Sequence, residues 1–204
     1  LAYADHHTAM TTALATGSNL PDVMAVDMGF IGKFAESGGL EDLSKAPYNA
    51  LQFRDKVARF TYTLAMSGQG VMVGMPVDIG PGALFYRKDL LDKAGFGEAE
   101  LTRSWESYSE AGRKLKAATG AWLLASAVDI KDIYIRSDLK DGEGVYFDKS
   151  GKPTIDNARF RKAFELAKAA REAGIDGKIG AWSNEWGEGF KRGKIATQMM
   201  GAWL

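Results

Sequence analysis

The chain has 204 residues and a formal net charge of zero, with 46% hydrophobic and 25% charged residues, as is typical of a globular protein. A balanced charge gives a phosphate backbone no basic surface, which argues against nucleic-acid binding, and no apolar run approaches the length that spans a membrane. The sequence contains no cysteine, which excludes disulfides and cysteine-liganded zinc.

The first quarter of the chain is predicted to form a helix, a strand and a second helix. Residues 5–16 and 28–36 carry apolar side chains at helical spacing, and residues 23–26 form a short apolar run typical of a buried strand. Asp27 follows that strand, where open α/β sheets bind ligands. Capping the second helix is an equally good interpretation of Asp27. A surface helix is expected over residues 49–60.

A break between two apolar runs divides the sequence. Residues 71–77 and 83–86 are predicted strands, separated by Gly80-Pro81-Gly82, and residues 88–95 are predicted to be a short helix that ends at a glycine. Strand, break, strand and helix is the order expected where a chain leaves one sheet for another, although an ordinary βα unit with a tight loop also fits. We predict a hinge at residues 78–82.

The second half is predicted to contain helices, strands and one small hairpin. Ser104 is the predicted N-cap of the first helix, and Asp129 follows a strand end as Asp27 does. In chain order the predicted elements are a helix from Ser104 to Gly120, a strand at 121–127, a helix at 129–139, a hairpin at 144–155, a helix at 158–173, a helix from 183 to 192 and a strand at 195–200.

Aromatic residues gather near the end of the chain. Trp182, Asn184 and Trp186 lie in a glycine-rich segment, and Trp203 follows the last predicted strand after two small residues. A core position is one interpretation of these tryptophans. Because aromatics flanked by glycine in loops are less typical of cores, we expect at least one of them to contact a ligand.

The order and spacing of four segments resemble the extracellular sugar-binding proteins of bacterial ABC importers, that is, the family 1 solute-binding proteins. Residues 20–40 are similar to the family's first-lobe signature, and residues 76–91 to its crossing from lobe one to lobe two. Ser104-Trp105-Glu106 is similar to the family's helix start, with Ser107 where an acidic residue is usual. Residues 190–203 resemble its return strand, and the four together span nearly the whole chain.

This resemblance implies a two-lobe, type II periplasmic-binding-protein-like α/β fold with an incomplete first lobe. Residues 1–79 would belong to lobe one, with 195–204 returning to it, and residues 80–194 would form lobe two. Family members start before Leu1 and continue past Leu204, so we expect an internal piece of a longer protein. The resemblance also implies a periplasmic or lipid-anchored cell-surface location, membrane ABC permease subunits as partners, a monomer and no cofactor.

A sugar offers hydroxyl groups and apolar faces, which proteins bind with carboxylates, amides and flat aromatic rings. The resemblance implies that Trp203 stacks on the sugar. Other members of the family carry residues different from aspartate at the position of Asp27. Adjacent histidines point to different sides of a helix, so His6 and His7 predict no metal site. The candidate ligand-binding residues are Trp203, Asp27, Asp78, Asp129, Asn184, Trp186 and Trp182.

Two other functions compete with sugar binding. A protein of the same fold could bind a non-sugar solute such as a polyol phosphate or a polyamine, but acidic and aromatic candidates favour a neutral polyol over an anion. A carbohydrate-active enzyme would need two carboxylates across the scissile bond, for which Asp27 and Asp129 are the candidates. Without a nucleophile elbow or a metal cluster in the sequence, we expect no catalysis.

Overall fold

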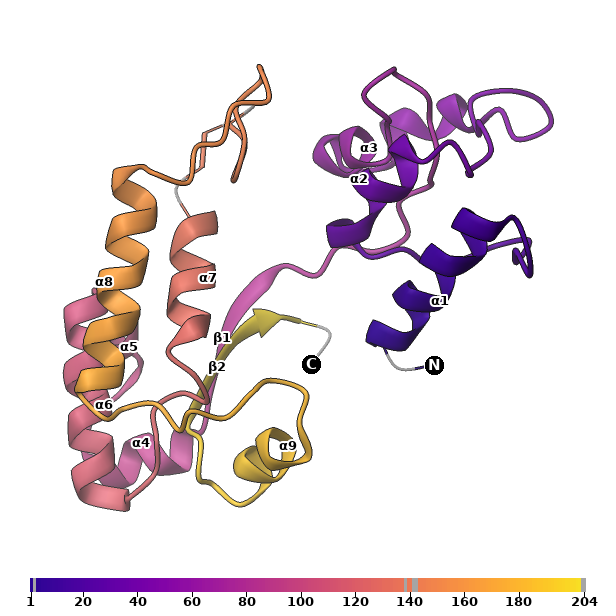
Figure 1. Cartoon of the computed structure of the whole chain (residues 1–204). Helices are drawn as coiled ribbons and strands as arrows, with labels where there is room; N and C mark the ends of the chain where they lie inside the picture. The colour runs from indigo at the N-terminus through magenta and orange to yellow at the C-terminus, as the bar shows by residue number, and fades with distance from the viewer. Residues whose placement is uncertain (2, 138, 141–142, 203–204) are drawn as a thin grey trace. The chain divides into compact units, whose positions relative to one another are not determined.

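The computed structural model describes residues 1, 3–137, 139–140 and 143–202 (Figure 1). The chain divides into two compact units, Leu1–Ile79 and Gly80–Leu204. Within the described ranges, no helix is both long enough and apolar enough to span a membrane.

The first unit is built from short helices around a small core. The predicted helix at 28–36 is confirmed with the same bounds, and its Phe34 is 1% exposed. The helices are α1 (Tyr3–Thr16), α2 (Met28–Glu36), the 3-10 helix η1 (Ala50–Lys56) and α3 (Arg59–Leu64). The buried apolar side chains are Ala13, Phe34, Ala35, Ala50, Ala65 and Met72.

The two strands predicted in the first unit are wrong. Residues 23–26 and 71–77 form no regular strand, and the second segment makes only a single bridge, between Met72 and Met66. Val23 and Val77 are 88% and 96% exposed. A strand requires a continuous hydrogen-bonded partner, and the second run has one only at residues 71–73, where the Ser67 amide donates to the Val71 carbonyl and the Val73 amide to the Ala65 carbonyl.

The surface helix predicted at 49–60 is also wrong. The chain forms η1, then the extended residue Val57, then α3. Val57 has φ −120° and ψ 157°, which no helix can accommodate, so the predicted helix is divided in two.

The second unit places six helices around a strand pair that the structure describes. Strands β1 (Gly82–Tyr86) and β2 (Thr197–Gly201) are antiparallel, with Gly82 opposite Gly201 and Tyr86 opposite Thr197. The helices are α4 (Lys88–Ala94), α5 (Glu98–Thr102), α6 (Trp105–Thr119), α7 (Val128–Arg136), α8 (Ala158–Glu172) and α9 (Asn184–Lys191).

Two extended segments widen this strand pair. The prediction of a regular strand at 121–127 is wrong, but single bridges join Trp122 to Ile195 and Leu124 to Asp176, both in parallel orientation. The Trp122 amide donates to the Lys194 carbonyl at 2.9 Å, and the Thr197 amide donates to the Leu123 carbonyl at 2.8 Å. Across the unit the order is therefore 175–179, 121–125, 194–201 and β1. The first three segments are parallel, so their carboxyl ends meet at one edge, where β1 begins.

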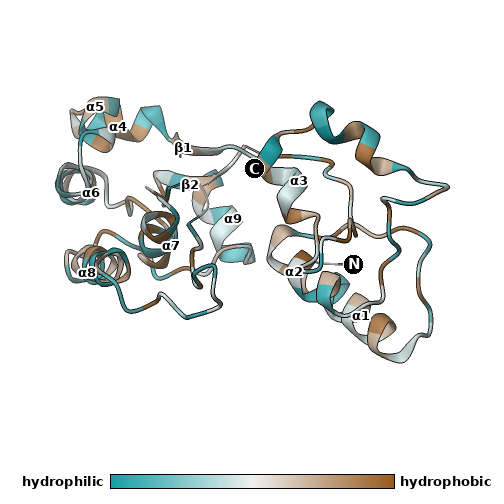
Figure 2. Ribbon diagram, turned by 90° about the horizontal axis from the view of Figure 1, so that it is seen from above, coloured by the Kyte–Doolittle hydropathy of each residue, from teal (hydrophilic) through white to brown (hydrophobic). Residues whose placement is uncertain are grey.

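Local capping signals set the bounds of α6 as predicted. The Ser104 hydroxyl accepts from the Ser107 amide at 3.1 Å, and α6 ends at Gly120, whose φ of 74° is left-handed. The helix predicted from 129 to 139 is α7, which ends three residues earlier, at Arg136. The helix α5 was not predicted. Figure 2, in which α8 is seen end-on, shows both hydrophilic and hydrophobic residues on this helix, as expected for a helix that packs one face against α7.

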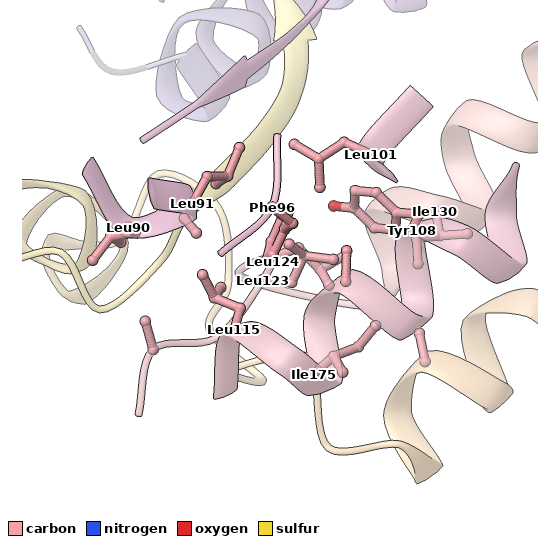
Figure 3. Close-up of a cluster of buried hydrophobic side chains, with 14 of the residues drawn as sticks. Leu90, Leu91, Phe96, Leu101, Tyr108, Leu115, Leu123, Leu124, Ile130 and Ile175 are labelled. Atoms are coloured by element: carbon pink, nitrogen blue, oxygen red, sulfur yellow. The ribbon is translucent and has the colours of Figure 1, made fainter. Parts of the chain in front are cut away.

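The main core of this unit lies where α6 meets the extended segments (Figure 3). Leu115 and Leu123 are fully buried, and so is Ile175. Gly112 faces this layer from α6, and a Cβ atom placed there would lie 2.9 Å from the Ile175 Cβ and 3.0 Å from a Leu123 methyl. A glycine is therefore required for this close packing.

We predict that Gly112→Ala lowers the free energy of unfolding by about 1–2 kcal/mol. Alanine favours a helix by about 1 kcal/mol over glycine. Overpacking a core costs about 1–3 kcal/mol, and the 2.9 Å approach to the Ile175 Cβ puts Gly112 in the upper part of that range, at about 2–3 kcal/mol. Gly187→Ala in α9 is the matched control, since a Cβ there meets no atom within 4 Å and should stabilise the protein. Urea unfolding of both variants measures the difference. Equal stability of Gly112→Ala and the wild type would contradict the prediction.

Candidate functional site

The carboxyl ends of the parallel segments in the second unit bring together several predicted ligand-binding residues. Residues 121–125 lead into α7, whose first turn contains Asp129, and residues 175–179 lead to Trp182 and to Asn184, the first residue of α9. Ligands of α/β proteins bind at this kind of edge. The topology therefore places a carboxylate, an indole and an amide where a ligand would approach.

Gln198 connects two of the candidate residues. It lies on β2 and is only 2% exposed. Its Oε1 accepts from the Trp186 Nε1 at 3.2 Å, and its Nε2 donates to the Asp129 Oδ2 at 3.4 Å and to the Met199 carbonyl at 3.2 Å. Gln198 was not among the predicted ligand-binding residues. Its signal was a polar amide in the predicted strand at 195–200, whose other polar residue is Thr197.

Asp129 is partly buried at the start of α7. Burial raises the pKa of Asp129, the hydrogen bond from Gln198 lowers it, and the charge of Asp132 raises it further. A carboxylate that is held away from water in this way has few competing water partners. It can therefore accept a hydrogen bond from a ligand hydroxyl at low desolvation cost.

An ion pair between a buried carboxylate and a partly exposed arginine fixes the position of α7. Asp176 is 4% exposed, and its Oδ2 lies 2.9 Å from Arg171 Nε and 2.8 Å from Arg171 Nη2. The same oxygen accepts from the Ala127 amide at 3.1 Å, just before α7 begins. Asp176 thus holds Ala127, the N-cap of α7, and thereby the start of the helix that contains Asp129.

The two tryptophans near α9 have different environments. Trp186 is 8% exposed and packs with Ala125, Ile179 and Ile195, whereas Trp182 is 67% exposed. Their ring centroids are 5.1 Å apart at 45°. A ligand role for either residue stays a prediction, but only Trp182 presents its ring widely to solvent.

The start of α9 shapes a shallow hollow of about 330 Å³. The sequence offers Ser183 or Asn184 as the cap of this helix, and the structure shows Ser183, whose hydroxyl accepts from the Trp186 amide at 3.1 Å, while the Asn184 side chain is exposed. The hollow is lined by Trp182, Ser183, Asn184, Trp186, Gly187, Glu188 and Lys191.

The remaining predicted residues are not part of this group. Asp27 accepts from the Gly29 amide at 2.8 Å, which confirms that it caps α2, and its own amide donates to His7 Nε2 at 3.2 Å. Asp78 is exposed in a stretch without helix or strand. Ligand contacts by Asp27 and Asp78 stay predictions, as does the hinge at 78–82. Trp203 lies outside the described residues.

Metal binding has no support in the part of the chain that the structure describes, where no group of three or more His, Asp or Glu side chains could hold an ion. His7 is 4% exposed and stacks on Phe30 with ring centroids 4.0 Å apart. Its Nδ1 lies 2.9 Å from the Tyr3 carbonyl. This histidine therefore fastens α1 to α2.

Comparison with known proteins relates the chain to one family. A family model described as "Bacterial extracellular solute-binding protein" matches residues 2–204. A lactose-binding protein of Rhizobium radiobacter is 28% identical over 100% of the chain and 48% of its own length. An arabinooligosaccharide-binding protein of Bacillus subtilis is 25% identical over 81% of the chain and 37% of its own length.

A solved structure shows the same fold. The GacH receptor of Streptomyces glaucescens, solved without ligand and with acarbose, has a TM-score of 0.78 and 25% identity, and the match covers 100% of the chain and 51% of the receptor. This likeness confirms the predicted fold class, the α/β fold of two-lobe periplasmic binding proteins. The chain spans about half the length of that receptor and of the lactose-binding protein.

We predict that Asp129→Asn raises the melting temperature at pH 7. Folding raises the pKa of Asp129, so its contribution to stability is fully present below the unfolded pKa of 3.8 and is lost as the pH rises through the folded pKa. Asparagine keeps an acceptor for Gln198 without the buried charge. The stability gain of the variant should therefore grow from pH 3.5 to pH 7.

Thermal unfolding across that pH range measures the effect. Glu165→Gln on α8 is the control, because Glu165 is exposed and its replacement removes the same charge without relieving burial. An Asp129→Asn protein that melts below the wild type at pH 7 would show that the ionised carboxylate is needed for stability.

Proposed function

Because the chain belongs to the bacterial extracellular solute-binding protein family, we propose that it binds a carbohydrate outside the cytoplasm and passes it to a membrane ABC importer. The observation that carries this proposal is the grouping of Asp129, Trp182 and Asn184 beyond the carboxyl ends of parallel segments. The names of the two relatives, which bind lactose and arabinooligosaccharides, support a carbohydrate as the ligand.

The chemistry of this group suits a neutral sugar. The exposed indole of Trp182 can cover an apolar sugar face, and the Asp129 carboxylate and Asn184 amide can pair with hydroxyl groups. Partly buried hydroxyl partners give selectivity, because an analogue without the hydroxyl leaves them unpaired. A binding protein of this kind needs no catalysis, so we propose that the protein is not an enzyme.

Location and assembly follow from the same proposal. A protein that collects sugars for an importer must reside in the periplasm or be held at the cell surface by a lipid anchor. We propose that it acts as a monomer whose partners are the permease subunits. A non-sugar solute, such as a polyol phosphate or a polyamine, is the second candidate ligand, although it would suit Asp129 and Trp182 less well than a neutral polyol.

We predict that lactose or an arabinooligosaccharide raises the melting temperature of the wild-type chain. A ligand that binds only the folded state stabilises it by about 2.7 kcal/mol at a hundred times its Kd. Glycerol 3-phosphate and spermidine serve as charged comparison ligands. Stabilisation by either of these, without any by the neutral sugars, would favour the second candidate ligand.

The same sugars test the absence of catalysis. Overnight incubation followed by chromatography should return them unchanged. Product above the level found with heat-inactivated protein would contradict the non-enzymatic proposal while leaving sugar binding intact.

We predict that Trp203→Ala weakens sugar binding about thirtyfold, or about 2 kcal/mol, because an aromatic anchor carries much of a binding energy. Trp122→Ala is the control, since Trp122 is half-buried under Lys116 Nζ at 4.2 Å, at the amino end of its segment. It should lower stability and leave the affinity unchanged. Calorimetric titration with lactose and thermal unfolding separate the two effects. A Trp203→Ala protein with wild-type affinity and a lower melting temperature would place Trp203 in a core.

A further inference from the structure

We propose that Gln198 is a positioning residue that holds Asp129 and Trp186 in the arrangement needed for ligand binding. This inference rests on the proposed function. Its basis is that one buried amide on β2 makes hydrogen bonds to both residues, which belong to different helices, α7 and α9. No other described side chain is hydrogen-bonded to both.

The donors and acceptors around Gln198 fix the orientation of its amide. The indole Nε1 of Trp186 can only donate, so it must face the amide oxygen. The Met199 carbonyl can only accept, so it must face the amide nitrogen, and the second N–H then points to the Asp129 carboxylate. Each N–H has an acceptor and the oxygen has a donor, so rotating the amide by 180° would break all three hydrogen bonds.

The neighbouring residue shows what a purely structural buried polar group looks like on the same strand. Thr197 is 1% exposed, donates to the Leu123 carbonyl at 2.6 Å and lies 2.7 Å from the Tyr108 hydroxyl. Because adjacent strand residues point to opposite faces, these partners belong to the core around α6. The partners of Gln198 instead lie at the start of α7 and in α9, beside the candidate site.

Two substitutions separate the roles of the amide. Gln198→Met keeps the approximate volume but leaves the Trp186 N–H and the Asp129 carboxylate without their shared partner. Gln198→Glu keeps an acceptor for Trp186 and places a second carboxyl group against Asp129. One of the two carboxyls must then hold a proton, so the effect of this variant depends on pH. Asp132 and Tyr108 are the other titratable groups whose charges act on, or respond to, Asp129.

The experiment combines lactose titration with the indole N–H resonance of Trp186 in ¹⁵N-labelled protein. We expect Gln198→Met to weaken lactose binding by roughly tenfold or more, a change of about 1.4 kcal/mol, and to move the Trp186 resonance. For Gln198→Glu we expect weak binding at pH 7 and recovery towards pH 5. Thr197→Val, the matched control, should lower the melting temperature while leaving both the affinity and the resonance unchanged.

Equal loss of affinity in Thr197→Val and Gln198→Met would overturn the proposal, as would a Gln198→Met protein with wild-type affinity. If the wild type does not bind lactose, the proposed function fails for that sugar, but the positioning role is still tested by the resonance. Asp129→Asn should then move the Trp186 resonance in the wild-type background and not in Gln198→Met. A shift of the same size in both backgrounds would show that Gln198 does not connect the two residues.

Discussion

The hydrogen bonding of β2 on both of its sides is the constraint on which the second unit depends. β1 pairs with it in antiparallel register, and on its other side the Thr197 amide donates to the Leu123 carbonyl. This register decides which face each side chain of β2 occupies. A slip by one residue would turn Thr197 away from the core and Gln198 into it, with the loss of both buried polar networks.

Burial of a polar group at this edge of the parallel segments lowers the stability of the fold but holds the group in a defined position. In the unfolded chain, water solvates the Asp129 carboxylate fully. In the folded chain the carboxyl group is partly buried, which disfavours its charged form and raises its pKa. Asp176 is buried more deeply, but Arg171 and the Ala127 amide compensate its charge. A protein selected only for stability has little reason to keep the Asp129 carboxylate at this place, and this is why Asp129 is the strongest carboxylate candidate.

Elements defined by neighbouring residues could be predicted from the sequence, whereas those defined by distant partners could not. The cap at Ser104 predicted a helix start correctly, and the sequence narrowed the cap of α9 to Ser183 or Asn184, because a capping hydrogen bond spans only three residues. The runs at 23–26 and 71–77 have strand-like composition, but a strand also needs a partner, which composition does not reveal. The site follows the same division. Asp129 was found from its place after an apolar run, but Gln198 was missed because its partners lie 12 and 69 positions away.

The comparison of Asp27 with Asp129 shows why the same sequence signal has two structural outcomes. Both follow an apolar run at the start of a helix, and both were candidate ligand contacts for that reason. Asp27 is the N-cap itself, so one of its carboxylate oxygens is taken up by the Gly29 amide. Asp129 is the second residue of α7, two positions after the N-cap, and its hydrogen bond comes from the amide of Gln198 on β2. A capping carboxylate is hydrogen-bonded to the backbone of its own helix. A carboxylate that is hydrogen-bonded to a distant strand is instead oriented by the tertiary structure. Such a group can be kept in place for a ligand.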